Sequence, residues 1–350
     1  MRKFFPLVII LLLFALTACS LYSEADSRAY YRPAVGWTVV KEQIREIELD
    51  GQNELKLEVQ DGNISLIPWE GDNLQVKEIK RLKAPERRKS LESNIGEYTT
   101  VYQNGPYIIS ISNKPPEKLK LFSRLTTDFE ISIPKKLKIL TIKGANGSIG
   151  LSGFEDLSIV DLSLETGTIR VKDIKAYRYD LEVKRGGLTA EKLEGKGSFK
   201  LTYGDAELKN INGEVQLKST SGRTVLKDVD GRVDCNISKG SLNISESFLK
   251  AGSSLYASNG DITADFSGID KEGGYSFMAA AGTIRLDFPD SAGFTLKAES
   301  VKGKIISDYK PSNVVQAADT DKKLSIIAAD GGPSINIYVD QGNIVLRRKP

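Results

Sequence analysis

The residues best suited to chemistry are acidic, because the chain contains no histidine. Without histidine there is no Ser-His-Asp or Cys-His nucleophile and no histidine-ligated zinc. Carboxylate pairs can still cleave polysaccharides, and the candidates beside the expected corner glycines are Asp205, Asp261 and Asp287. These three fall at different positions of the repeated unit described below, so they should not converge. We therefore assign them to turns and solvated strands and predict no catalytic residue.

Metal chemistry is not indicated either. Acidic repeats that bind calcium as a β-roll follow the pattern Gly-Gly-x-Gly-x-Asp with a period of nine. The glycine pairs at Gly186, Gly273 and Gly331 lack the following Gly-x-Asp. We predict no metal site and no cofactor.

Basic residues occupy many outward positions of the expected strands. If the strands stack in register, these residues form a candidate binding stripe for anionic glycans, teichoic acid or lipid headgroups. Glu182, Glu207 and Glu214 are interspersed, a pattern that is also typical of an ordinary solvated face. The stripe consists of Arg170, Lys172, Lys184, Lys200, Lys209, Lys218 and Lys227.

A short unit, Gly-x-apolar-x-apolar, must position these residues, and it recurs at a spacing near twenty. A fixed period of this size is typical of stacked units that cannot bury their apolar faces alone. Glycine supplies the positive φ of a sharp corner, or lets neighbouring turns approach closely. The predicted corner glycines are Gly62, Gly147, Gly167, Gly187, Gly204, Gly222, Gly240, Gly260, Gly282, Gly303 and Gly342.

Two all-β architectures can use such strands. Antiparallel hairpins would make a sandwich or a barrel, whereas equal spacing of similar units favours a coil in which each strand stacks on its counterpart. Hairpins invert direction and rarely keep one motif in phase over many units. The spacing therefore predicts a parallel β-helix, a solenoid with turns of about 20 residues.

The mature chain divides into two β regions. Residues 38–140 alternate as strands do and are expected to form the first turns and to cover one exposed edge of the stack. Within them, the charged segment Lys83–Asn94 is expected to be a short helix or a protruding loop. Residues 141–350 hold the repeat, in which a long loop over Asp308–Lys323 precedes a last rung opened by Gly342.

The N-terminus predicts the compartment. Two basic residues precede an apolar run, Phe4–Leu16, that is too short to span a bilayer and is typical of a secretory signal. Cys19, directly after Leu-Thr-Ala, resembles the lipobox of bacterial lipoproteins. The resemblance implies cleavage between Ala18 and Cys19 and acylation of Cys19. We thus expect a signal peptide (1–18), a tether (19–37) and a lipid anchor at the extracytoplasmic face of a bacterial membrane, whether inner, outer or single.

Net charge and cysteine content restrict the possible partners. Removal of residues 1–18 leaves 47 basic and 46 acidic residues. A nearly neutral chain gives no electrostatic reason to expect that it binds nucleic acid. The second cysteine, Cys235, alternates with Asp234 and Asn236 and is expected to be a buried core thiol.

Three features resemble the bacterial putative-adhesin family of β-helix domains of unknown function. They are the segment Asp61–Leu66, the segment Phe129–Ile149 and the ladder of glycine copies, and together they cover about residues 40–346. The resemblance implies a single-stranded right-handed β-helix without catalytic residues. Thr224 stands where the pattern usually has Ile, so one rung is expected to be irregular.

The expected function is that of a non-catalytic cell-envelope lipoprotein, either an adhesin-like surface binding module or a structural element. Its expected partners are the membrane, through the lipid, and glycans, cell-wall polymer or envelope proteins. Two alternatives stay open. One is a polysaccharide-active β-helix enzyme that uses Asp or Glu, and the other is a regulatory lipoprotein of an envelope sensor system.

Overall fold

One sheet of 18 strands accounts for most of the described chain. The computed structural model describes residues 36–85, 88–113, 123–309, 321–329 and 331–349. Helix α1 (Arg88–Asn94) lies within the charged segment Lys83–Asn94, which agrees with the helix alternative for that segment, and the 3-10 helix η1 (Ile95–Glu97) follows it. Among the described residues, no helix is long and apolar enough to cross a membrane.

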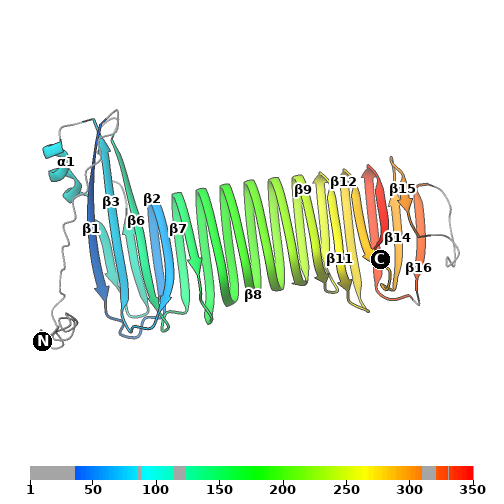
Figure 1. Ribbon diagram of the computed structural model, residues 1–350, viewed down its shortest axis with the longest axis horizontal. Helices are drawn as coiled ribbons and strands as arrows, with labels where there is room; N and C mark the ends of the chain where they lie inside the picture. Colours follow the sequence, from blue (N-terminus) through cyan, green and yellow to red (C-terminus); the bar gives the residue numbers. More distant parts are fainter. Residues whose placement is uncertain (1–35, 86–87, 114–122, 310–320, 330, 350) are drawn as a thin grey trace, which may run out of the picture.

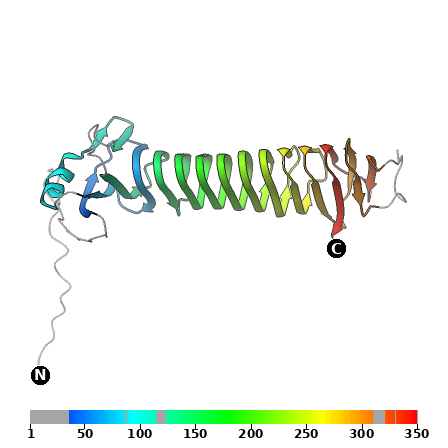
Figure 2. The ribbon, with the colours of Figure 1, turned by 90° about the horizontal axis from the view of Figure 1, so that it is seen from above.

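The strands are stacked along the long axis of the molecule (Figures 1 and 2). The first seven are β1 (Trp37–Ile47), β2 (Glu54–Trp69), β3 (Leu74–Ala84), β4 (Thr100–Asn104), β5 (Ile108–Asn113), β6 (Arg124–Pro134) and β7 (Ile139–Ser152). The middle is formed by β8 (Leu157–Gly231) and β9 (Val233–Leu249). The remaining strands are β10 (Ser254–Asn259), β11 (Ile262–Ile269), β12 (Gly274–Ala281), β13 (Ile284–Pro289), β14 (Phe294–Ser300), β15 (Ile305–Ser307), β16 (Lys323–Ala328), β17 (Ser334–Gln341) and β18 (Ile344–Lys349).

Pairing in the middle of the stack is parallel, which confirms the all-β prediction and excludes hairpins there. Each glycine copy pairs with the next one, as Gly147 does with Gly167 and Gly222 with Gly240. Strand β8 is 75 residues long and would span about 250 Å if it were straight. It instead folds back on itself, because Gly186 lies against Gly167 and Gly204 against Gly186.

Alternation along these strands builds one long core, apart from a small second cluster around α1 at the N-terminal end. One apolar cluster runs through the stack from Leu55 to Leu346. Cys235 is 1% exposed within it, which confirms the predicted core thiol. Burial, with a smaller effect of Asp234, raises the pKa of this thiol, so little reactive thiolate is available.

The corner glycines bring the main chains of successive layers into contact. Gly204 has a φ of +133°, which L side chains rarely adopt. A Cβ atom built on Gly204 would overlap the carbonyl oxygen of Gly186. Both the backbone conformation and the space at this corner therefore require glycine.

The same main-chain contact repeats through the whole stack. We term these residues the glycine ladder, and each layer of the stack a rung. In order of contact, the ladder is Gly62, Gly147, Gly167, Gly186, Gly204, Gly222, Gly240, Gly260, Gly282, Gly342 and Gly303.

Two of the predicted corners need correction. Gly186, with a φ of +134°, occupies the corner that was assigned to Gly187. Gly187 has no positive φ. A Cβ atom added to Gly187 would lie 3.6 Å from Thr168 Cγ2, which is an ordinary van der Waals contact. Gly303 has the ladder contact, to Gly342, but not the positive φ.

A second corner was not predicted. Gly195, Gly213 and Gly231 form another column in which each glycine excludes a Cβ by contact with the preceding rung. Close before it, a column of polar residues adopts the left-handed conformation. Its members are Asp173, Lys192, Asn210, Asp228 and Glu246, with φ of 52–54°.

Antiparallel strands cover the N-terminal end. Strand β2 continues the stack, because it pairs in parallel with β7, and also pairs in parallel with β5 and β6. Beyond these, β3 pairs antiparallel with β6, β1 with β3, and β4 with β5. The outer strands thus leave the parallel repeat, so the stack ends there.

The order of strands at the other end corrects the expectation that the Gly342 copy closes the stack. Strand β18 pairs with β13 on one side and β15 on the other, and β17 lies between β12 and β14. Figures 1 and 2 show the red C-terminal strands inside the stack. Strand β16 pairs antiparallel with β14 as an outer strand. Most of the long loop predicted before it, 310–320, lies outside the described residues.

Thr224 does not interrupt its rung, contrary to expectation. It is fully buried and pairs in unbroken register with Leu242. Register shifts occur instead between β11 and β9, on either side of Phe266. Thr and Ile are both β-branched, so the strand conformation is kept.

The ladder predicts a large difference between two neighbouring kinds of glycine. Replacement of Gly204 by Ala should lower the free energy of unfolding by roughly 2–4 kcal/mol, because it combines strain with overlap of main chains. The control, Gly187→Ala, should change it by less than about 1 kcal/mol. Urea unfolding followed by circular dichroism measures both, and equal stability of the two variants would contradict the assigned corners.

Candidate binding face

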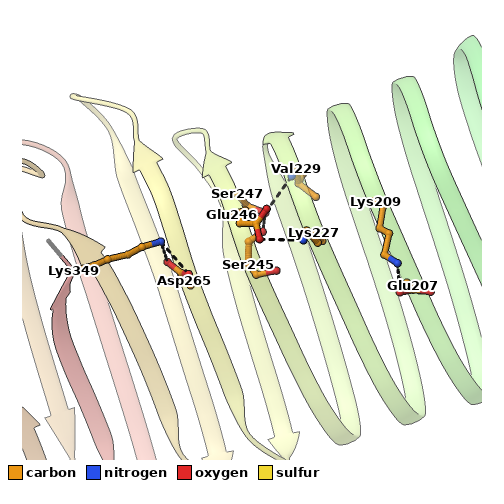
Figure 3. A network of polar contacts seen from close by, with 9 residues as sticks. All are labelled: Glu207, Lys209, Lys227, Val229, Ser245, Glu246, Ser247, Asp265 and Lys349. Atoms are coloured by element: carbon orange, nitrogen blue, oxygen red, sulfur yellow. Dashed lines mark hydrogen bonds and ion pairs between the residues drawn. The ribbon is translucent and has the colours of Figure 1, made fainter.

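The seven predicted stripe cations are mostly neutralised by neighbours. Four of them form ion pairs, two of which are shown in Figure 3. The pairs are Lys172–Glu191 (3.3 Å), Lys184–Glu165 (2.7 Å), Lys209–Glu207 (2.6 Å) and Lys227–Glu246 (3.0 Å). The bond between Lys184 and Glu165 raises the pKa of the lysine and lowers that of the glutamate.

The structure also divides these cations between two sides of the glycine ladder. Lys218 lies before the Gly222 corner and Lys227 after it. Lys200 likewise precedes Gly204, whereas Arg170 follows Gly167. Arg170, Lys200 and Lys218 have no ion-pair partner among the described residues. The stack therefore presents scattered free cations, and only Lys200 and Lys218 precede their corners at the same distance.

An outward row of side chains, which we term the tyrosine row, crosses the second half of the stack. Its members are register partners on neighbouring strands and therefore point to the same side. Met278 and Tyr338 are each 42% exposed. The row is Lys218, Asn236, Tyr256, Met278, Tyr338, Glu299 and Lys323, on strands β8, β9, β10, β12, β17, β14 and β16.

A second outward row, termed the polar row, runs beside the first, two residues earlier on each parallel strand and two residues later on the antiparallel strand β16. Most of its members are short polar side chains, and Lys297 is its one cation. The row is Gln216, Asp234, Ser254, Ser276, Asn336, Lys297 and Ser325. The two rows together form one face of the stack, the candidate binding face.

The distal part of this face is hollowed into a groove of about 680 Å³. Met278 and Tyr338 are its exposed apolar side chains, and Asn336, Lys297 and Ser325 contribute polar surface. Glu299 and Lys323 also line it, and they pair with each other at 3.0 Å. Because β17 lies between β12 and β14, the inserted C-terminal strand supplies the central residues of the groove.

Comparison with known proteins places the chain in a family. The sequence pattern of the Toastrack DUF4097 family matches residues 52–347. The chain belongs to this family. No curated protein matches the chain significantly.

Solved structures similar to this Toastrack DUF4097 chain include three bacterial proteins. A putative cell adhesion protein from Clostridium sporogenes ATCC 15579 is 15% identical, with 89% of this chain and 100% of that chain covered and a TM-score of 0.19. A putative adhesin from Bacteroides fragilis NCTC 9343 is 13% identical, with 88% and 97% covered and a TM-score of 0.30. A putative adhesin from Parabacteroides distasonis ATCC 8503 is 13% identical, with 87% and 97% covered and a TM-score of 0.24.

Two of the three candidate catalytic carboxylates in this Toastrack DUF4097 domain bind main chain. Asp205 Oδ1 accepts a hydrogen bond from Arg223 N at 2.8 Å, and Asp261 Oδ1 accepts one from Thr283 N at 2.7 Å. In each case the aspartate directly follows one ladder glycine, and the N–H that it binds belongs to the residue that directly follows the next ladder glycine. The two carboxylates thus join rungs and are not brought together.

The third candidate, Asp287, lies beside another carboxylate but also beside cations. Its register partners are Asp265 on β11 and Arg347 on β18. Asp265 in turn accepts a hydrogen bond from Lys349 at 2.8 Å (Figure 3). The C-terminal strand therefore supplies positive charge to this acidic pair.

Outside the predicted sites, the carboxyl group of Asp161 has a shifted pKa, as catalytic carboxyl groups often do. Burial, and then the charge of Asp180, raise its pKa. Asp180 is paired with Arg178 at 2.8 Å, so the two acids do not form a free pair. Within the described part of the chain, no group of three or more acidic or cysteine side chains is arranged to hold a metal ion.

Sequence reasoning missed the candidate binding face. Tyr256, Met278 and Tyr338 are far apart in sequence, and the inserted strand puts the last two side by side. The available signal was the recurrence of an outward aromatic or Met side chain four residues before a ladder glycine. This pattern can be recognised only when the segments are aligned on Gly260, Gly282 and Gly342.

The bond from Asp205 to the next rung separates a structural role from a catalytic one. Asp205→Ala should lower the free energy of unfolding by about 1 kcal/mol, because Arg223 N loses its acceptor. Asp205→Asn should keep most of the stability, since Asn343 Oδ1 accepts the equivalent bond from Lys304 N. Chemical denaturation measures the difference, and an Ala variant as stable as the wild type would refute the structural assignment.

Proposed function

We propose that this chain is a cell-envelope lipoprotein whose β stack is a non-catalytic rod that presents a binding face away from the membrane. The observation that carries the proposal is the separation of the two ends. Strand β1, which follows the N-terminal segment, lies at one end of the stack, and the groove lies toward the other (Figure 1). A rod held at its first end would therefore expose the groove farthest from the lipid.

The anchor in this proposal is Cys19. Ala18, Cys19 and the tether through residue 35 lie outside the described residues, so their roles rest on the sequence. A basic start, a short apolar run and Leu-Thr-Ala-Cys support cleavage before Cys19 and its acylation. Two or more acyl chains would hold the protein stably, because each buried CH₂ contributes about 0.8 kcal/mol.

In this proposal the stack is one right-handed parallel solenoid with rungs of about 20 residues. The parallel register of the glycine copies and the unbroken path of β8 support it. A right-handed path is favoured because parallel crossovers between twisted strands have that hand. Such a rod offers rows of outward side chains in place of an enclosed catalytic cleft.

The non-catalytic assignment is supported by the use of the carboxylates. Asp205 and Asp261 bind main-chain N–H groups, and Asp265 binds Lys349. A glycosidase needs two carboxyl groups on opposite sides of a scissile bond. The face with a groove offers instead Tyr338, Met278 and Asn336, which suit binding.

The anchor can be tested with the two cysteines of the chain. In bacteria fed labelled palmitate, the wild type and Cys235→Ala should carry label and sediment with membranes, because Cys235 is buried in the core. Cys19→Ala should lose the label and leave the membrane fraction, since acylation supplies the membrane affinity. Retention of label and membrane binding by Cys19→Ala would rule out the proposed anchor.

A further inference from the structure

We propose that the candidate binding face binds a carboxylate-bearing polysaccharide laid along the stack, with its anchoring contacts in the groove around Tyr338 and Lys297. The inference rests on the proposed function, in that it names the ligand of the same rod. Three independent features of the face carry it.

The first feature is the chemistry of the polar row. Gln, Ser and Asn side chains each offer both a donor and an acceptor, as hydroxyl-rich sugars require. Asn336 and Ser325 belong to this row and line the groove. Ser254 and Ser276 continue it on the next strands toward the middle of the stack. Apart from Asp234 and Lys297, the row thus offers neutral hydrogen-bonding groups over several strands.

The second feature is the apolar strip beside these polar groups. Tyr338 and Met278 are neighbours in register, and both are substantially exposed without a covering segment among the described residues. An aromatic face combines apolar area with a polar tip, which suits the C–H faces and hydroxyls of a sugar ring. Tyr256, two strands from Tyr338, lies roughly 10 Å away along the stack. An extended chain could therefore meet both rings.

The third feature is an excess of positive charge, because the two rows hold Lys218, Lys297 and Lys323 against Asp234 and Glu299. Glu299 and Lys323 neutralise each other, whereas Lys297 has no ion-pair partner among the described residues. Lys218, at the other end of the tyrosine row, is likewise unpaired within the described part of the chain. A ligand carboxylate beside Lys297 would form a charge-assisted hydrogen bond. Five strand spacings, about 24 Å, separate the two lysines, so a polymer with repeated carboxylates could reach both.

The size of the groove favours a saccharide over a protein partner. Its volume of about 680 Å³ lies within the range typical of sites for small ligands. A stable protein interface would need about 800 Å² per partner around a fully buried apolar centre. Here the exposed large apolar side chains of the groove are only Met278 and Tyr338, and polar or charged side chains lie beside them.

The test is binding of the full-length protein in detergent to an array of carboxylated, sulfated, phosphorylated and neutral polysaccharides. A carboxylated polymer should bind best. Tyr338→Ala should weaken that binding about tenfold, through loss of the aromatic contact, and Lys297→Gln should weaken it in a salt-dependent manner. Tyr177→Ala is the matched control, because Tyr177 is 72% exposed and lies on neither row. Circular dichroism confirms that each variant is folded.

Three results would overturn the inference. The first is that no carboxylated polysaccharide binds. The second is that Tyr177→Ala and Tyr338→Ala lose the same amount of affinity. The third is that sulfated polymers bind as tightly as carboxylated ones and that Lys297→Gln weakens the binding whereas Tyr338→Ala does not. Capture of a protein ligand that Tyr338→Ala abolishes, without polysaccharide binding, would refute the saccharide and leave the binding rod intact. If the wild type carries no palmitate label, the proposed lipid anchor is refuted, whereas the polysaccharide array still tests the ligand.

Discussion

Contact between main chains at the glycine ladder is the constraint on which the rest of the structure depends. At each ladder corner the carbonyl oxygen of one glycine occupies the place that a Cβ of the next would need. This contact fixes the register of neighbouring rungs. In a strand a shift of one residue would exchange the buried and exposed faces. The corners therefore determine which side chains form the core and which form the outward rows.

Around these corners, short polar bonds repeat the same connection. Asp205, Asp261 and Asn343 each directly follow a ladder glycine. Each accepts a hydrogen bond from the main-chain N–H of the residue that follows the neighbouring ladder glycine. The exposed ion pairs between rungs are individually weak. Stability then rests mainly on the continuous core and on the corners. Outward residues away from the corners contribute little to this packing, and the proposed binding face consists of such residues.

The inserted C-terminal strands connect the fold with the proposed function. Because β17 enters between β12 and β14, Tyr338 lies beside Met278 and Asn336 beside Lys297. The same insertion places Arg347 beside Asp287. At both ends, antiparallel pairing replaces the parallel repeat, and this interrupts the template that would otherwise accept another parallel rung. The distal face is thus a product of how the stack ends.

The amino-acid pattern predicted the interior better than the surface. Period-two alternation and glycine spacing foretold the core positions, the parallel pairing and the burial of Cys235. The same spacing could not tell Gly186 from Gly187, since which of two adjacent glycines takes the corner depends on contact with Gly167. The order of Gly282, Gly342 and Gly303 also escaped prediction, because it is set by packing between distant segments. For that reason the row through Tyr338 was missed, while a basic stripe was expected.

The most direct test of this account is the position of β18, measured by disulfide formation between introduced cysteines. Asp287→Cys/Arg347→Cys joins register partners on β13 and β18 and should form a disulfide. Arg285→Cys/Ile306→Cys should not, because Val345 lies between them and they are roughly 10 Å apart. Efficient cross-linking of the second pair without the first would show that β15 adjoins β13, and would contradict the inserted strand and the distal face built on it.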